Sequence, residues 1–95
     1  MDRCVVVEPK FHPGVILVMP DAQKVLTKED VFVALSRHIV GDWGDIGVAA
    51  WKRNDRSLQL GQRVVSVYHA GNGNEFWVIT DRERSLTTIL VPTKS

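Results

Sequence analysis

The chain has 95 residues, of which 44% are hydrophobic and 24% are charged, and its formal net charge is +1. This length favours one domain over residues 1–95, because two cores would each bury too little apolar surface. Residues 1–50 carry 5 basic and 7 acidic side chains, whereas residues 51–95 carry 7 basic and 4 acidic ones. The basic excess of the second half permits local phosphate contacts, but it is too small to indicate nucleic-acid binding. It also argues against an acidic DNA mimic.

Cysteine usage and hydropathy point to the compartment. The single Cys4 excludes an internal disulfide and fits a reducing environment. No signal peptide is recognisable at the N-terminus, and no run approaches the roughly 18 apolar residues that a membrane span needs. We therefore expect a cytoplasmic protein that does not contact a membrane. A chain this short needs efficient packing, so a homodimer is an open alternative to a monomer.

After an N-terminal arm over residues 1–13, the segment 14–60 is expected to hold one strand and the helices. A compact apolar run at 15–19 predicts the strand, and a short helix follows before residue 27. Thr27 and Asp30 form a capping-box pattern at the start of a helix over residues 28–40. One side of that helix faces inward and carries Val31, Ala34, Leu35 and His38.

The segment 61–92 has a period of two and predicts a β-meander. A third helix over residues 47–58, with Asp45 as its expected cap, comes before it. Three runs of strand character then follow at 63–68, 75–80 and 85–91. The chain is therefore expected to be an α+β domain, with two or three short N-terminal helices packed on an antiparallel sheet of three or four strands.

Both faces of the middle predicted strand are apolar. Trp77 and Ile79 fall on one face, and Phe76 and Val78 fall on the other. Two short helices can cover only one face of such a sheet. The other face must meet the N-terminal arm, a partner chain or a ligand, which is the physical argument for an interface.

The stretch from Arg37 to Asp45 concentrates the candidate chemistry. His38 is either a core-edge histidine hydrogen-bonded to a carbonyl or to Asp42, or a working acid–base group. Trp43 is expected to plug the core, while Asp42 and Asp45 are expected to cap loop amides. Both acids lie in one tight loop, which makes a paired-carboxylate hydrolase an unfavourable interpretation.

Other site types find little support. The three histidines are isolated, and no CxxC or HxxxH spacing occurs, so we expect no metal and no cofactor. The Gly71–Gly73 turn follows a strand but opens no helix, unlike a phosphate-cradling loop. The chain also has no Gly-x-Ser-x-Gly elbow for a nucleophilic serine.

A basic set in the second half has two interpretations. These arginines and lysines are ordinary solvated charges, or some of them converge on His38. In the second case, His38 would act as acid–base, Arg63 and Arg84 would clamp a phosphate, and Ser66 or Thr87 would position the substrate. Such a set could cleave RNA without a metal.

Several segments together resemble a family of small bacterial plasmid-related proteins, found on plasmids and integrated mobile elements. The resemblance covers about residues 14–92. It rests on Arg37-His38-x-x-Gly41-Asp42-Trp43-Gly44-Asp45, Asn54-Asp55, Arg63-x-x-Ser66-x-Tyr68, Trp77-Val78-Ile79-Thr80 and Arg84-Ser85-x-Thr87-Thr88-x-Leu90-x-Pro92. The family has no settled activity, so the resemblance implies a mobile-element setting and not a reaction.

The chain departs from the family at three places. Relatives usually carry Asp where Glu83 stands, an acidic helix start where residues 48–50 stand, and a tyrosine near the C-terminus. The fold class is also similar to that of the barnase and RelE-like ribonucleases, but this similarity is an analogy between folds.

Two hypotheses follow. The first is a mobile-element accessory protein that acts by protein binding, with interference with host defence as its role. Its candidate binding residues are Arg37, Asp42, Trp43, Asn54 and Tyr68. The alternative is the metal-independent ribonuclease described above, with RNA as the partner.

Overall fold

The computed structural model describes residues 8–92, and it confirms the α+β class. Residues 1–7, which include Cys4 and most of the predicted N-terminal arm, lie outside the described part. The elements in chain order are β1 (Val15–Val18), α1 (Pro20–Val25), α2 (Lys28–His38), α3 (Val48–Leu60), β2 (Val64–His69), β3 (Glu75–Thr80) and β4 (Leu86–Leu90).

The four strands form one sheet in the order β1-β4-β3-β2. The predicted meander is present, because β2, β3 and β4 pair with one another in antiparallel fashion. The expectation of a wholly antiparallel sheet is wrong at β1, which pairs in parallel with β4. No hairpin links these two strands, and all three helices lie between them in the chain, so turn geometry does not set their relative direction.

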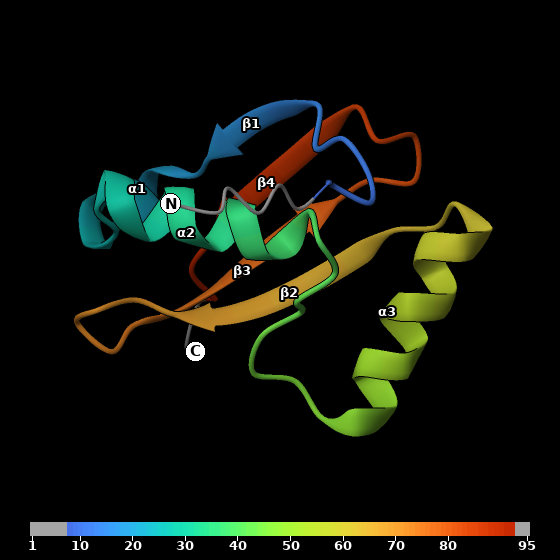
Figure 1. The fold of residues 1–95 in the computed structure, drawn as a ribbon. Helices are drawn as coiled ribbons and strands as arrows, with labels where there is room; N and C mark the ends of the chain where they lie inside the picture. Colours follow the sequence, from blue (N-terminus) through green and yellow to red (C-terminus); the bar gives the residue numbers. More distant parts are fainter. Residues whose placement is uncertain (1–7, 93–95) are drawn as a thin grey trace, which may run out of the picture.

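Two helices cover one face of the sheet, and the third lies beside it. Figure 1 shows α1 and α2 in front of the sheet, whereas α3 lies next to the edge strand β2. We call the covered side the inner face. Its side chains from β2, β3 and β4 are all buried: Val64, Ser66, Tyr68, Phe76, Val78, Thr80, Thr87 and Ile89.

The helix boundaries follow local capping chemistry. The predicted capping box of α2 is present, with the Thr27 hydroxyl accepting from the Asp30 amide and the Asp30 carboxylate accepting from the Thr27 amide. Gly61, in the left-handed conformation, ends α3. The expectation that Asp45 caps α3 is wrong, since Gly47 occupies the cap position and makes no side-chain bond.

The loop before β1 packs against the end of α2 and the loop that follows it. The Lys10 amide donates to the Ile39 carbonyl, and the buried Phe11 packs with Trp43 and Val64. No helix within residues 8–92 is long and apolar enough to cross a membrane.

Candidate functional site

The loop after α2 is held by an ion pair between Arg37 and Asp42. The Arg37 Nε and Nη2 atoms donate to the two Asp42 carboxylate oxygens at 2.8 and 3.1 Å. The guanidinium also lies 4.6 Å from the centre of the Tyr68 ring, whose hydroxyl donates to the Asp42 carbonyl. The bond to Arg37 lowers the pKa of Asp42. Asp42 is therefore bound to Arg37. It does not bond His38, although the sequence left Asp42 open as a partner of that histidine.

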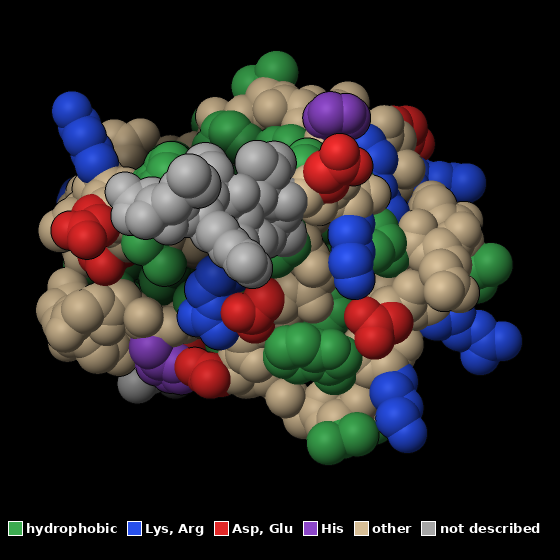
Figure 2. Space-filling model, viewed as in Figure 1, with side chains coloured by type: hydrophobic (Ala, Val, Ile, Leu, Met, Phe, Trp, Pro, Cys, Tyr) green, Lys and Arg blue, Asp and Glu red, His purple; other side chains and the backbone are tan. Residues whose placement is uncertain are grey.

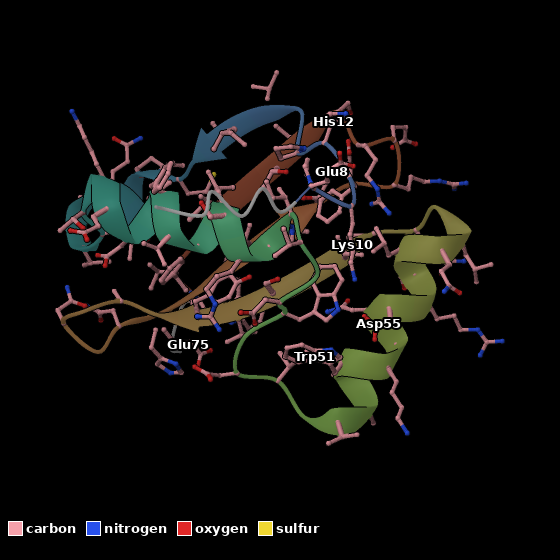
Figure 3. The ribbon with its side chains drawn as sticks, in the orientation of Figure 1. Glu8, Lys10, His12, Trp51, Asp55 and Glu75 are labelled. Carbon is pink, nitrogen blue, oxygen red and sulfur yellow. The ribbon has the colours of Figure 1, made fainter. Side chains whose placement is uncertain are left out.

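Trp43 is buried at this loop and acts as a plug. Its indole lies 6.3 Å from the Phe11 ring and 5.6 Å from the His38 ring, centre to centre. The indole N–H donates to the Asp55 carboxylate at 2.9 Å. Figure 3 shows Asp55 and Trp51 on the side of α3 that faces the 39–47 loop. Trp43 thus links this loop to α3 and closes the space over His38.

His38 is buried and bonded through both ring nitrogens. Its Nδ1 lies 2.6 Å from the Ser66 hydroxyl, and its Nε2 lies 2.8 Å from the Thr80 hydroxyl. The Thr80 and Thr87 hydroxyl oxygens are 2.6 Å apart, and Thr87 donates to the carbonyl of Pro13 at 2.6 Å. These groups form one buried chain of hydrogen bonds across three strands.

The end of this chain fixes its direction. The Pro13 carbonyl can only accept a hydrogen bond, so the Thr87 hydroxyl donates its one proton to it. Thr87 must then accept the hydrogen bond that it shares with Thr80. Thr80 then accepts from His38, which places the imidazole proton on Nε2. The remaining nitrogen, Nδ1, accepts from Ser66. The arrangement satisfies every member with His38 neutral.

The surroundings keep His38 neutral. Burial, together with the positive charge of Arg84, lowers its pKa to about 3. An imidazole that is neutral, bonded through both nitrogens and enclosed by Trp43 is not positioned to exchange protons with a substrate. The arrangement does not support the acid–base role that the ribonuclease hypothesis gives to His38. Ser66 and Thr87 are buried in the same chain and are not free to position a substrate either.

The two arginines proposed as phosphate clamps do not come together at His38. Arg84 lies over the Phe11 ring at 5.2 Å and donates to the Asp81 carbonyl from a backbone with φ of 58°. Its Nη2 is buried without a hydrogen-bond partner among the described residues. Arg63 is exposed and lines a groove with Asn54 and Val65. No shared phosphate site follows from these positions.

The edge of β2 is closed by side-chain and loop bonds. The Asn54 side chain donates to the Val65 carbonyl at 2.6 Å and accepts from the Val65 amide at 3.3 Å, as a neighbouring strand would. Further along, Val67 bonds the Trp43 carbonyl and the Asp45 amide. Gly44 makes this approach possible, since its φ is 79° and a Cβ there would lie 2.0 Å from the Val67 carbonyl oxygen. Asn54 and Trp43, predicted as binding residues, therefore have structural roles.

The second face of the sheet, which we call the outer face, carries no helix of residues 8–92. Strand register assigns its side chains, because paired residues point to the same side. All but one of the central ones are apolar: Val15 and Leu17 of β1, Leu86, Thr88 and Leu90 of β4, Trp77 and Ile79 of β3, and Val65 and Val67 of β2. None of these nine is charged.

The outer face is accessible over its whole width. Val15 and Leu17 are 69% and 46% exposed, Leu86 is exposed at 36%, and the other six are partly exposed. By contrast, Figure 2 looks onto the helix side, where Lys, Arg, Asp and Glu side chains are spread among the apolar ones. A continuous apolar sheet face of this kind is a candidate interaction surface.

The two ends of the outer face differ in charge, because one carries the carboxylates of Asp45 and Glu75 and the other carries arginines together with Asp81. At one end, the His69 Nδ1 lies 2.7 Å from the Asp45 carboxylate, and the Trp77 indole donates to Glu75. At the other end, Arg63 and Arg82 lie together beside Asp81. Asp81 is held by the Ser85 hydroxyl and amide and by the Leu86 amide, whereas Arg63 makes no ion pair within residues 8–92.

Part of this surface could be predicted from the sequence, and the rest could not. The apolar second face of β3 was predicted from the alternation of Trp77 and Ile79, and the structure confirms that no described helix covers it. A strand at 15–19 was predicted as a possible fourth strand of the sheet, but its parallel pairing with β4 was not, because this pairing has no local signal. The bond between Asp45 and His69 joins residues 24 apart, and no spacing motif announces it.

Comparisons with known proteins found no relative of this chain. No family model, no curated protein and no solved structure matches the chain. Within residues 8–92, no three His, Cys, Asp or Glu side chains come together as metal ligands would.

Proposed function

We propose that the protein acts by binding another protein chain through its outer face. The observation that carries this proposal is the apolar row across four strands, which no helix of the described chain covers. A sheet that buries one face and leaves nine uncharged side chains fully or partly exposed on the other keeps water against a contiguous apolar area. Binding a protein surface of matching shape would remove that area from water.

The inner-face contacts support this choice over an enzyme. The polar residues first considered for chemistry are tied to one another: His38 to Ser66 and Thr80, and Arg37 to Asp42. They satisfy buried groups and shape the loop after α2. Arg63 and the Nη2 atom of Arg84 have no such partner within residues 8–92, but they do not share a site, and the apolar outer face suits association better than proton transfer.

The sequence resemblance to plasmid-related proteins extends the proposal to a setting. In that setting, the protein is an accessory of a mobile element, and its protein contacts interfere with the defences of the host cell. The outer face would be the surface through which it does so.

A site-specific crosslinking experiment tests the binding surface. A photo-reactive amino acid placed at Thr88, in the middle of the outer face, should give one discrete protein adduct in living bacteria. The same amino acid at Phe32, which is 71% exposed on α2, is the matched control and should give none. Adding Leu17→Lys to the Thr88 probe should remove the adduct.

Equal adducts at Thr88 and Phe32, or none at Thr88, would contradict the proposal. For the mobile-element role, plasmid acquisition can be compared between cells that express the wild type, Thr88→Lys or Phe32→Lys. The proposal predicts that only Thr88→Lys loses the effect of the wild type.

A further inference from the structure

The chemistry of the outer face points to a particular occupant. We propose that two copies of this chain pack outer face to outer face with their strands antiparallel, when no other protein is bound. This inference rests on the proposed function, because it names what covers the same surface. It requires that the face be self-complementary in shape, in polarity and in charge.

Polarity is the simplest requirement. A sheet face made of Val, Leu, Ile, Trp and Thr side chains is matched by another face of the same composition, as in the two halves of a β-sandwich. None of the nine central side chains is charged, so no charge would be buried at the centre of the contact.

Charge selects one of two possible orientations. The two-fold axis of a face-to-face dimer lies in the plane between the sheets. If that axis ran along the strands, the Glu75 ends of the two copies would meet and repel each other. If it runs across the strands, the end with Asp45 and Glu75 lies over the end with Arg63 and Arg82 of the other copy. The antiparallel arrangement is therefore favoured.

The remaining charges at each end do not reverse this preference. His69 is bonded to Asp45, and its other nitrogen lies 3.8 Å from Glu75. Glu83 lies 3.8 Å from Arg82, and Asp81 is held by the turn that follows β3. Within residues 8–92, Arg63 makes no ion pair and is available to an acidic partner, as is Arg53 in the groove beside it.

The size of the face sets the expected strength. Four strands at a spacing of about 4.8 Å, paired over about five residues, make a flat face of roughly 300 Å². Side chains that project from the sheet and the charged ends add to this area. Two copies together would then bury about 1,000 Å² of accessible surface, near the lower limit for a specific interface. The dimer should therefore form in the micromolar range and dissociate on dilution.

Sedimentation velocity of the purified protein tests the dimer. The wild type should change from monomer to dimer between about 1 µM and about 1 mM. Thr88→Lys places a charge at the centre of the face and should weaken association by about tenfold or more. Leu17→Lys should act in the same way at a more exposed position, and Phe32→Lys, on α2, should dimerise like the wild type. Thermal melts at low concentration establish that each variant is folded.

A charge exchange tests the orientation. Glu75→Arg and Arg63→Glu should each weaken the dimer, and the double variant should restore it. Failure of the double variant to restore association would overturn the antiparallel arrangement. A wild type that stays monomeric up to about 1 mM, or a Phe32→Lys variant as weak as Thr88→Lys, would overturn the dimer.

The outcomes also separate this inference from the proposed function. If the purified protein is monomeric but the Thr88 probe captures a different protein in cells, the dimer is excluded and the binding surface stands. If the protein is monomeric and the probe captures nothing, both are excluded.

Discussion

The two faces of the sheet reverse the usual distribution of polar groups. The covered inner face contains a buried chain of hydroxyls and an imidazole, whereas the accessible outer face is almost entirely apolar. A buried polar chain is tolerable because all its members are satisfied, and it fixes the position of α2 over three strands. An apolar accessible face favours association, because covering it removes apolar area from water. The polarity of a sheet face in this protein therefore does not by itself reveal whether that face has a function.

The largest expected difference in the free energy of unfolding is between alanine variants of two tryptophans, Trp43 in the core and Trp77 on the outer face. Trp43→Ala should lower the free energy of unfolding by about 3–5 kcal/mol, because it empties a buried space next to Phe11 and His38. Trp77→Ala, on the outer face, should cost about 1 kcal/mol in the monomer, because its indole is already partly exposed. Chemical denaturation at low micromolar concentration measures both. Equal losses would contradict the division into core and binding face.

Two histidines give the next comparison. His38→Ala should cost about 2–4 kcal/mol, because the Ser66 hydroxyl loses its acceptor and Thr80 loses its donor inside the core. His69→Ala, which breaks an exposed pair with Asp45, should cost about 0.5 kcal/mol or less. Thermal melts of the two variants side by side provide the measurement, and a mild effect at His38 would mean that the imidazole is not enclosed.

Acid should destabilise the protein through His38 before it affects the carboxylates. The pKa of His38 is about 3 in the folded protein and 6.5 in the unfolded chain, so the unfolded chain binds more protons between these values. Stability is fully present above pH 6.5 and should fall by about 2 kcal/mol between pH 7 and pH 5. Denaturation at a series of pH values measures this slope. His38→Gln, which does not titrate, should be flat over the same range, and an unchanged slope would assign the loss to other groups.

The same substitution at two adjacent threonines, one on each face, should give the smallest difference in stability. Thr87→Val should cost about 1–2 kcal/mol, because the Pro13 carbonyl and the Thr80 hydroxyl lose their partner in a buried place. Thr88→Val, one residue further on the outer face, should change the free energy of unfolding by no more than about 0.5 kcal/mol. The two variants differ only in which face they occupy, and a reversal of this order in urea denaturation would contradict the assigned register.

Much of the fold is readable from sequence because its signals are local. The capping box at Thr27, the inward stripe of α2 and the alternation in β2 to β4 all depend on residues a few positions apart. The parallel pairing of β1 could not be predicted in this way, since nothing near β1 specifies β4 as its neighbour.

The candidate site was harder to predict for the same reason. His38 could be recognised as inward-facing, but its partners Ser66 and Thr80 lie 28 and 42 residues away. The uncovered outer face, in contrast, followed from the alternation of Trp77 and Ile79 and from the small number of helices.

The central claim is that the outer face is a binding surface, which pairs with a second copy in the purified protein, while the inner face is the core. Backbone NMR spectra of the wild type, recorded from about 10 µM to about 1 mM, test it most directly. The account predicts that signals of outer-face residues such as Val67 and Thr88, and the indole N–H of Trp77, shift with concentration while those of Phe32 on α2 do not. Shifts confined to α2, or no shifts anywhere up to the highest concentration, would contradict the self-association that the outer face predicts.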